Sequence, residues 1–142
     1  MDLVFSAFDE KVGPIAIFST IEDPILTKII AAKSIISAFR LVDTSTSHPL
    51  EGEVIIPFPQ EKKVVFIYCT ELDQKTNSGD RRMITLSAVV DQDQNNQLYS
   101  KASELSRSAA EIRDILNTNY AFGQPLSQHL MNRLEEWSRV IP

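Results

Sequence analysis

The sequence predicts an α/β fold of the α+β kind, in which one helix covers one face of a five-stranded, mainly antiparallel sheet and two C-terminal helices cover the other. Three observations predict it. The periodic segments follow the order β-β-α-β-β-β-α-α. The central strand segments are apolar at both their odd-numbered and their even-numbered positions, and each helical segment has an apolar face wide enough to cover a sheet. With no internal repeat or linker, residues 1–142 are expected to form a single domain.

The chain opens with two short apolar runs, residues 3–8 and 15–19, which predict a hairpin. Both runs are rich in β-branched or aromatic residues, and a polar turn separates them. In this turn Gly13 is expected to supply an unusual backbone conformation, and Pro14 to begin an outer strand. The turn is therefore expected to be structural.

A long helix is predicted over residues 25–40. Asp23 can accept backbone N–H bonds as the N-cap, and Pro24 suits the first helical position because no intrahelical partner needs its missing N–H. Apolar residues follow at a helical spacing, at positions 25, 29, 32, 36 and 39. Their broad face predicts that this helix lies on the sheet.

Three further strands are expected after a polar loop at residues 43–52. The first covers residues 54–58 and contains Pro57, which indicates an edge strand because proline cannot donate to the ladder. The others cover residues 64–70 and 83–90, and the charged segment between them is expected to be a long exposed loop at residues 71–82.

Two helices are predicted at the C-terminal end. The first has an amphipathic pattern with a break at residues 117–123, and Pro125 is expected to begin the second. The run at residues 91–95 is expected to turn the chain and cap the first of them. The residues on the apolar faces are Leu98, Ala102, Leu105, Ala109, Ile112 and Leu116, then Leu126, Leu130, Leu134, Trp137 and Ile141.

Composition narrows the classes of function. The net charge of -5, without a basic cluster, argues against nucleic-acid binding. A lone cysteine, Cys69, fits a reducing compartment. The chain has neither a signal-peptide pattern nor an apolar run of roughly 20 residues that could span a bilayer. The expected localisation is cytoplasmic.

No motif in the chain predicts a catalytic, cofactor or metal site. The single glycine of the opening turn precedes a proline and a strand, unlike a phosphate-binding loop. Cys69 lies in the most apolar strand, where cysteine usually acts as a small hydrophobe, and His48 and His129 belong to no ligand set. Residues 91–95 lack the glycine and the closing glutamate of a calcium loop. A non-enzyme is expected.

The surface predicted for partner binding is a groove between the first helix and the edge strand. The helix has few charges, and its apolar face is wide enough to remain partly uncovered beside the strand. The interface candidates are Ile36 and Phe39 on the helix and Ile56 and Phe58 on the strand. The alternative is that this face is wholly buried.

The element order and the opening turn together resemble the longin domain family. Residues 9–14 (DEKVGP) are similar to the first hairpin of longin modules in trafficking proteins, and the order of elements extends the resemblance over essentially the whole chain. The roadblock fold ranks second, because it places a helix before the first hairpin and only one after the last three strands.

The resemblance implies a non-catalytic scaffold in vesicle-mediated transport and small-GTPase regulation. It implies a protein partner, either a small GTPase or a second longin or roadblock-type subunit in a homodimer or heterodimer. Contact with internal membranes would be indirect, through such partners. The alternative function is a small-molecule sensor of the PAS or GAF kind, which needs a cavity above about 300 Å³ between sheet and helix.

Overall fold

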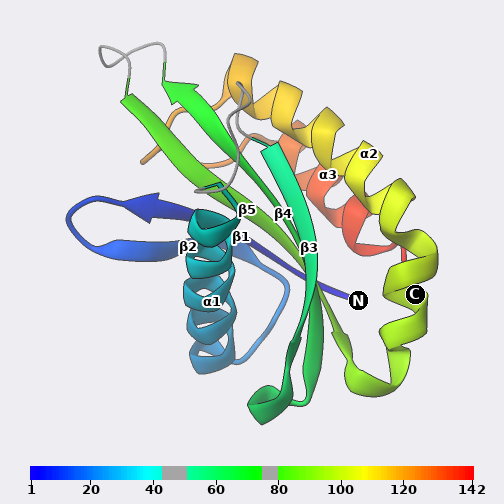
Figure 1. Cartoon of the computed structure of the whole chain (residues 1–142). Coiled ribbons are helices and arrows are strands. Elements are labelled where there is room, and N and C mark those ends of the chain that lie inside the picture. Colours follow the sequence, from blue (N-terminus) through cyan, green and yellow to red (C-terminus); the bar gives the residue numbers. More distant parts are fainter. Residues whose placement is uncertain (43–50, 75–79) are drawn as a thin grey trace.

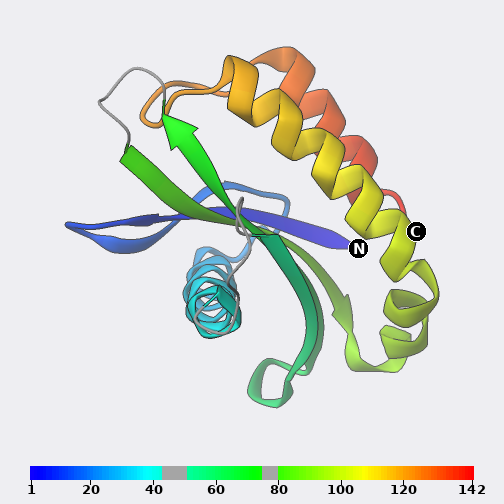
Figure 2. The ribbon, with the colours of Figure 1, turned by 45° about the horizontal axis from the view of Figure 1, so that its top comes forward.

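The computed structural model describes residues 1–42, 51–74 and 80–142, and these residues form three layers (Figure 1). Helix α1 (Pro24–Val42) lies on one face of a five-stranded sheet, and helices α2 (Asn95–Asn119) and α3 (Gln128–Ser138) lie on the other, as Figure 2 shows. The order β-β-α-β-β-β-α-α confirms the predicted fold class.

The sheet has the strand order β2-β1-β5-β4-β3, and every neighbouring pair is antiparallel. β3 lies at one edge, as Pro57 predicts, and β2 lies at the other. The strands are β1 (Asp2–Asp9), β2 (Gly13–Ser19), β3 (Glu51–Phe58), β4 (Lys63–Gln74) and β5 (Asp80–Asp91).

Two of the predicted loops are shorter than expected. The β4–β5 ladder continues to Gln74↔Asp80, so residues 71–74 and 80–82 are strand, although their charge indicated a loop. Leu72 is fully buried, which explains why pairing extends this far. Gly52, predicted to lie in the first of these loops, belongs to β3. A side chain at this position would come too close to α1, because an added Cβ would lie 2.5 Å from Leu41 Cδ2. Residues 43–50 and 75–79 of the predicted loops lie outside the described residues.

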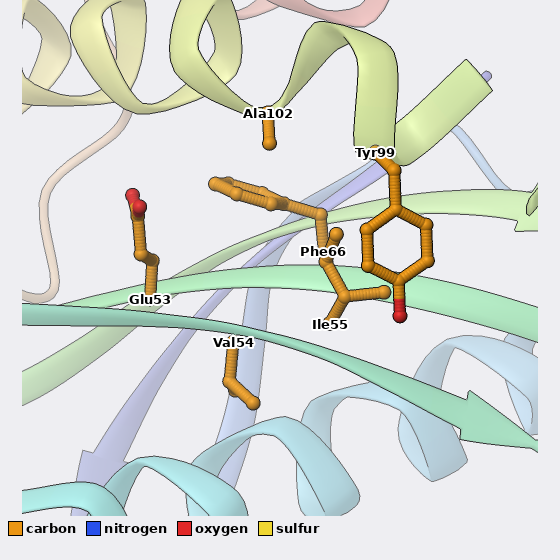
Figure 3. Close-up of a pocket in the computed structure, with 6 residues that line it drawn as sticks. All are labelled: Glu53, Val54, Ile55, Phe66, Tyr99 and Ala102. Carbon is orange, nitrogen blue, oxygen red and sulfur yellow. The ribbon is translucent and has the colours of Figure 1, made fainter. Parts of the chain in front are cut away.

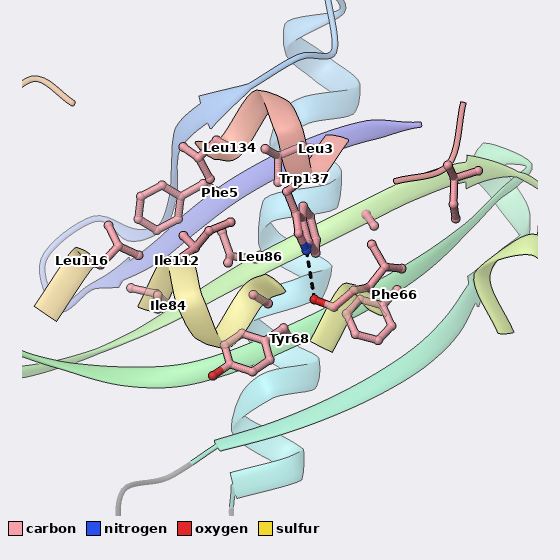
Figure 4. Close-up of a cluster of buried hydrophobic side chains, with 14 of the residues drawn as sticks. Leu3, Phe5, Phe66, Tyr68, Ile84, Leu86, Ile112, Leu116, Leu134 and Trp137 are labelled. Atoms are coloured by element: carbon pink, nitrogen blue, oxygen red, sulfur yellow. Dashed lines mark hydrogen bonds between the residues drawn. The ribbon is translucent and has the colours of Figure 1, made fainter. Parts of the chain in front are cut away.

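Both faces of the central strands are buried, which confirms the two-sided pattern. The larger core lies under α2 and α3, where Trp137 Nε1 donates a hydrogen bond of 3.0 Å to the carbonyl oxygen of Leu105 (Figure 4). Smaller clusters lie under α1 and include Val65 and Ile67 of β4. The α1 interface also contains small polar residues, because the hydroxyl groups of Ser34 and Ser87 hydrogen-bond there at 2.7 Å.

The helix boundaries agree with the predictions at one end of the chain and differ at the other. Asp23 Oδ1 accepts the Ile25 N–H at 2.9 Å, so it caps α1 as expected. α3 begins at Gln128 and not at Pro125, because Ser127 is the residue that caps it by accepting the Leu130 N–H at 3.1 Å. α2 continues to Asn119, and the side chain of its N-cap residue makes no capping hydrogen bond.

Candidate interaction site

The turn between β1 and β2 is held by its own side chains. Gly13 has φ of +88° and would have open space around an added Cβ, so the backbone conformation is what requires glycine here. The carboxylate of Asp9 accepts the N–H groups of Lys11 at 2.8 Å and Val12 at 3.0 Å, and these bonds lower the pKa of Asp9. Those two N–H groups are therefore occupied within the turn.

Among the described residues, Cys69 and His129 lie on opposite faces of the sheet. Cys69 is fully buried under α1, and burial raises the pKa of its thiol to about 11, so the thiol is protonated at neutral pH. His129 is exposed on α3, while His48 lies outside the described residues. In the part of the chain that the structure describes, no three His, Cys, Asp or Glu side chains are grouped to hold a metal.

The outer face of α1 is apolar at positions where a surface helix usually carries charge. Ile25 and Ile36 are 69% and 51% exposed, and Phe39 is 38% exposed. The edge of the Phe39 ring meets Phe8 of β1 with ring centroids 5.0 Å apart, so this side chain has a defined position. Ile36 and Phe39 thus lie on the surface, as the sequence predicts.

A groove does lie between α1 and β3, where the sequence places one. We call it the α1-side hollow; its volume is about 280 Å³, and Ser37, Arg40, Leu41, Val54 and Ile56 line it. Of the four predicted interface residues, only Ile56 lines this hollow. Phe39 instead packs against β1, and Ile36 lies on the exposed outer face of α1.

The expectation that Phe58 offers a binding surface is wrong. Its side chain is only 3% exposed and belongs to the core under α1. Lys33 Nζ lies 5.0 Å from the centre of the Phe58 ring and forms an ion pair with Glu61. Alternation along β3 turns Phe58 toward α1, where Lys33 lies over its ring, and the sequence of the strand alone does not reveal this contact.

A second hollow lies across β3 from the first, and sequence reasoning missed it. This α2-side hollow has a volume of about 240 Å³ (Figure 3). Figure 3 shows Glu53 and Ile55 on its side of β3 and Val54 turned toward α1. The sequence signal that could have indicated this hollow is Tyr99, an aromatic residue beside the apolar face of α2. In the structure its side chain is 61% exposed. The lining residues are Glu53, Val54, Ile55, Phe66, Tyr99 and Ala102.

The start of β3 is fixed to the strand and helix beside it. Tyr68 Oη donates to Glu51 Oε1 at 2.7 Å, and Arg113 Nη1 of α2 donates to Glu51 Oε2 at 2.6 Å. Burial, the largest cause, raises the pKa of Tyr68, so its phenol keeps the proton that it donates to Glu51. This cluster links the start of β3 to β4 and α2, two residues before Glu53 of the α2-side hollow.

Comparison with solved structures identifies the class of this fold. The structure is similar to the Lst4 longin domain from K. lactis, with a TM-score of 0.65 over 97% of this chain and 91% of that chain. The sequence identity is 15%, so the likeness shows the fold. No protein-family model and no curated protein matches the sequence. The chain therefore has a longin-like fold, as its opening turn and element order predicted.

Two further observations bear on the classes of function. Both hollows open at the surface beside β3 and have volumes below the roughly 300 Å³ of a typical ligand cavity, so neither supports the sensor alternative. In the described ranges 1–42, 51–74 and 80–142, no helix has both the length and the apolarity to cross a membrane.

Proposed function

We propose that this protein is a non-catalytic interaction module that binds another protein through α1 and the adjoining edge of the sheet. The observation that carries the proposal is the apolar outer face of α1, where Ile25 and Ile36 are more than half exposed. The longin-like fold supports it, because domains of this kind generally act as scaffolds.

The contrast with α2 strengthens this reading of α1. Only three of the 19 residues of α1 are charged, and all three are basic. The outer face of α2 instead carries ionic side chains such as Lys101, Glu104 and Glu111, as a solvated helix should. An apolar face left in water is unfavourable, and contiguous exposed apolar surface commonly marks a protein contact.

The resemblance to longin modules supplies the proposed class of partner. The partner would be a small GTPase or a second longin or roadblock-type subunit, in a homodimer or heterodimer. The role would be in vesicle-mediated transport or small-GTPase regulation, in the cytoplasm, with any contact to internal membranes made by the partner.

A single substitution on α1 tests the proposal. Ile36→Asp places a charge on the exposed face of α1, at a side chain outside the buried core. It should abolish association with the partner because the carboxylate would have to be desolvated. Light scattering would measure association with purified small GTPases in both nucleotide states, with longin and roadblock-type proteins of the source organism, and with the chain itself.

The matched control is Ser103→Asp, which introduces the same charged residue at an exposed position of α2 on the opposite face of the sheet. It should leave association unchanged. Binding that survives Ile36→Asp, or the lack of any association in the whole series, would contradict the proposed function.

A further inference from the structure

Among the described residues no strand pairs with the outer edge of β3, and the register shows which of its backbone groups point outward. Lys62 lies opposite Gln92, because the β4–β5 pairing runs without a shift from Lys63↔Asp91, and the Gln92 N–H donates to the Lys62 carbonyl at 3.2 Å. Hydrogen-bonded pairs alternate along an antiparallel ladder, so the even-numbered residues of β4 bond to β5. The odd-numbered residues of β4 therefore bond to β3.

The β3–β4 register then separates the two sets of residues on β3. Val65 and Ile67 of β4 lie opposite Ile56 and Val54, so these even-numbered residues of β3 carry the ladder bonds. The backbone groups of Glu53 and Ile55 consequently point away from the sheet. Pro57 falls in the same outward set, where its missing N–H removes no ladder bond.

The two hollows lie on either side of this open edge. Val54 and Ile56 border the α1-side hollow, while Glu53 and Ile55 border the α2-side hollow (Figure 3). A strand added beside β3 would send successive side chains to opposite faces of the sheet. Its side chains would thus enter the two hollows alternately, which is the arrangement that strand addition uses for specificity.

The charges at the edge indicate the chemistry of the added strand. Glu53 is exposed at the α2-side hollow and Arg40 is exposed at the α1-side hollow. Among the described residues neither of them has an ion-pair partner. β3 carries two glutamates and no basic residue, so the β3 of a second copy would offer no basic side chain to Glu53.

We propose that an extended segment of a partner protein adds to the open edge of β3 as a sixth strand. Its apolar side chains alternate between the two hollows, with a basic side chain beside Glu53 and an acidic side chain beside Arg40. This inference rests on the proposed function and specifies the form of the partner. Pro57 ends the stretch of the edge that offers backbone N–H groups.

A library of linear peptides displayed on phage provides the probe. Selected peptides should carry apolar side chains on both faces of the added strand. The face toward the α2-side hollow should also carry a basic residue, and the face toward the α1-side hollow an acidic residue. When such a peptide binds, amide hydrogen exchange at Glu53 and Ile55 should slow, since their N–H groups become bonded. A selection that yields no binding peptide, or peptides that protect amides elsewhere, would overturn the inference.

Two substitutions at position 53 distinguish the contribution of the backbone N–H to peptide binding from that of the side-chain charge. Glu53→Pro removes an outward N–H without removing a ladder bond and should reduce peptide binding below detection. Glu53→Thr keeps the N–H and removes only the charge, so the affinity should fall about two- to fivefold, as expected for an exposed ion pair. Equal losses in the two variants would overturn strand addition, provided that thermal unfolding shows both to be folded.

Ile36→Asp and Glu53→Pro together show whether the failure of one proposal also refutes the other. A protein partner that is lost with Ile36→Asp and retained with Glu53→Pro would leave the interaction module standing and would refute strand addition. If a selected peptide is lost with Glu53→Pro while no protein associates through α1, the proposed use of the α1 face fails and the open edge of β3 stands as the binding site.

Discussion

Individual residues of similar character have opposite roles in this protein. Phe39 and Phe58 are both aromatic residues beside the α1–β3 groove in the sequence-based prediction. The structure places Phe39 on the surface and Phe58 in the core, with exposed fractions of 38% and 3%. The difference arises because Phe58 lies beneath Lys33 of α1, a contact between segments far apart in the chain.

Stability measurements can check this difference. Phe58→Asp removes a buried ring and buries a carboxylate, so the free energy of unfolding should fall by at least about 3 kcal/mol. Ile36→Asp lies on the exposed side of α1 and should change it by no more than about 0.5 kcal/mol. Urea unfolding followed by circular dichroism measures both, and a stable Phe58→Asp variant would show that Phe58 is not a core residue.

Asp9 predicts a dependence of stability on pH. Its pKa in the folded state is lowered from 3.8, first by the hydrogen bond from the Lys11 N–H and then by the bond from Val12. A lowered folded-state pKa contributes stability above the unfolded-state pKa, and this contribution is lost as the pH falls through the folded-state value. Asp9→Asn should therefore be less stable than the wild type near pH 7.

The stability gap between the wild type and Asp9→Asn should close as the pH falls below about 4. The asparagine oxygen can still accept a hydrogen bond, so the comparison isolates the charge. Unfolding free energies measured between pH 2 and pH 7 provide the check, and Glu10→Gln in the same turn is the control. A gap that is constant over this range would contradict the role of the carboxylate.

At the scale of elements, boundaries depended on capping contacts that the pattern of apolar residues does not report. Pro125 indicated the start of the last helix, but the side chain that caps its first turn, by accepting the Leu130 N–H, belongs to Ser127. The charged residues 71–74 and 80–82 indicated a loop, yet they extend the β4–β5 ladder. Strand pairing tolerates polar residues there because backbone hydrogen bonds, rather than side chains, form the ladder.

The cap of α3 can be tested directly. Ser127→Ala removes the hydrogen bond to the Leu130 N–H, and the free energy of unfolding should fall by about 1 kcal/mol, a typical cost for losing an N-cap. Chemical unfolding measures the change, with Ser103→Ala on the exposed side of α2 as the control. Equal stability of Ser127→Ala and the wild type would indicate that α3 does not depend on this cap.

At the scale of the whole molecule, the two faces of the sheet are covered in different ways. α2 and α3 cover the larger core and present charged outer surfaces, whereas α1 covers smaller clusters and is apolar on its outer side as well. The edge of β3 borders the α1-side hollow, while Ile36 lies on the outer face of α1 and Phe39 packs beside β1. This asymmetry supports the proposed use of one side of the domain for binding.

The sequence by itself determined the order of elements, the two-sided burial of the central strands and the edge position of β3. These features follow from local patterns: the spacing of apolar residues, the cap at Asp23 and the proline within β3. The tertiary structure decided which aromatic side chain is exposed, which backbone groups of β3 are free and where the two hollows lie. Those features depend on register and packing between distant segments, and a local pattern in the chain cannot encode them on its own.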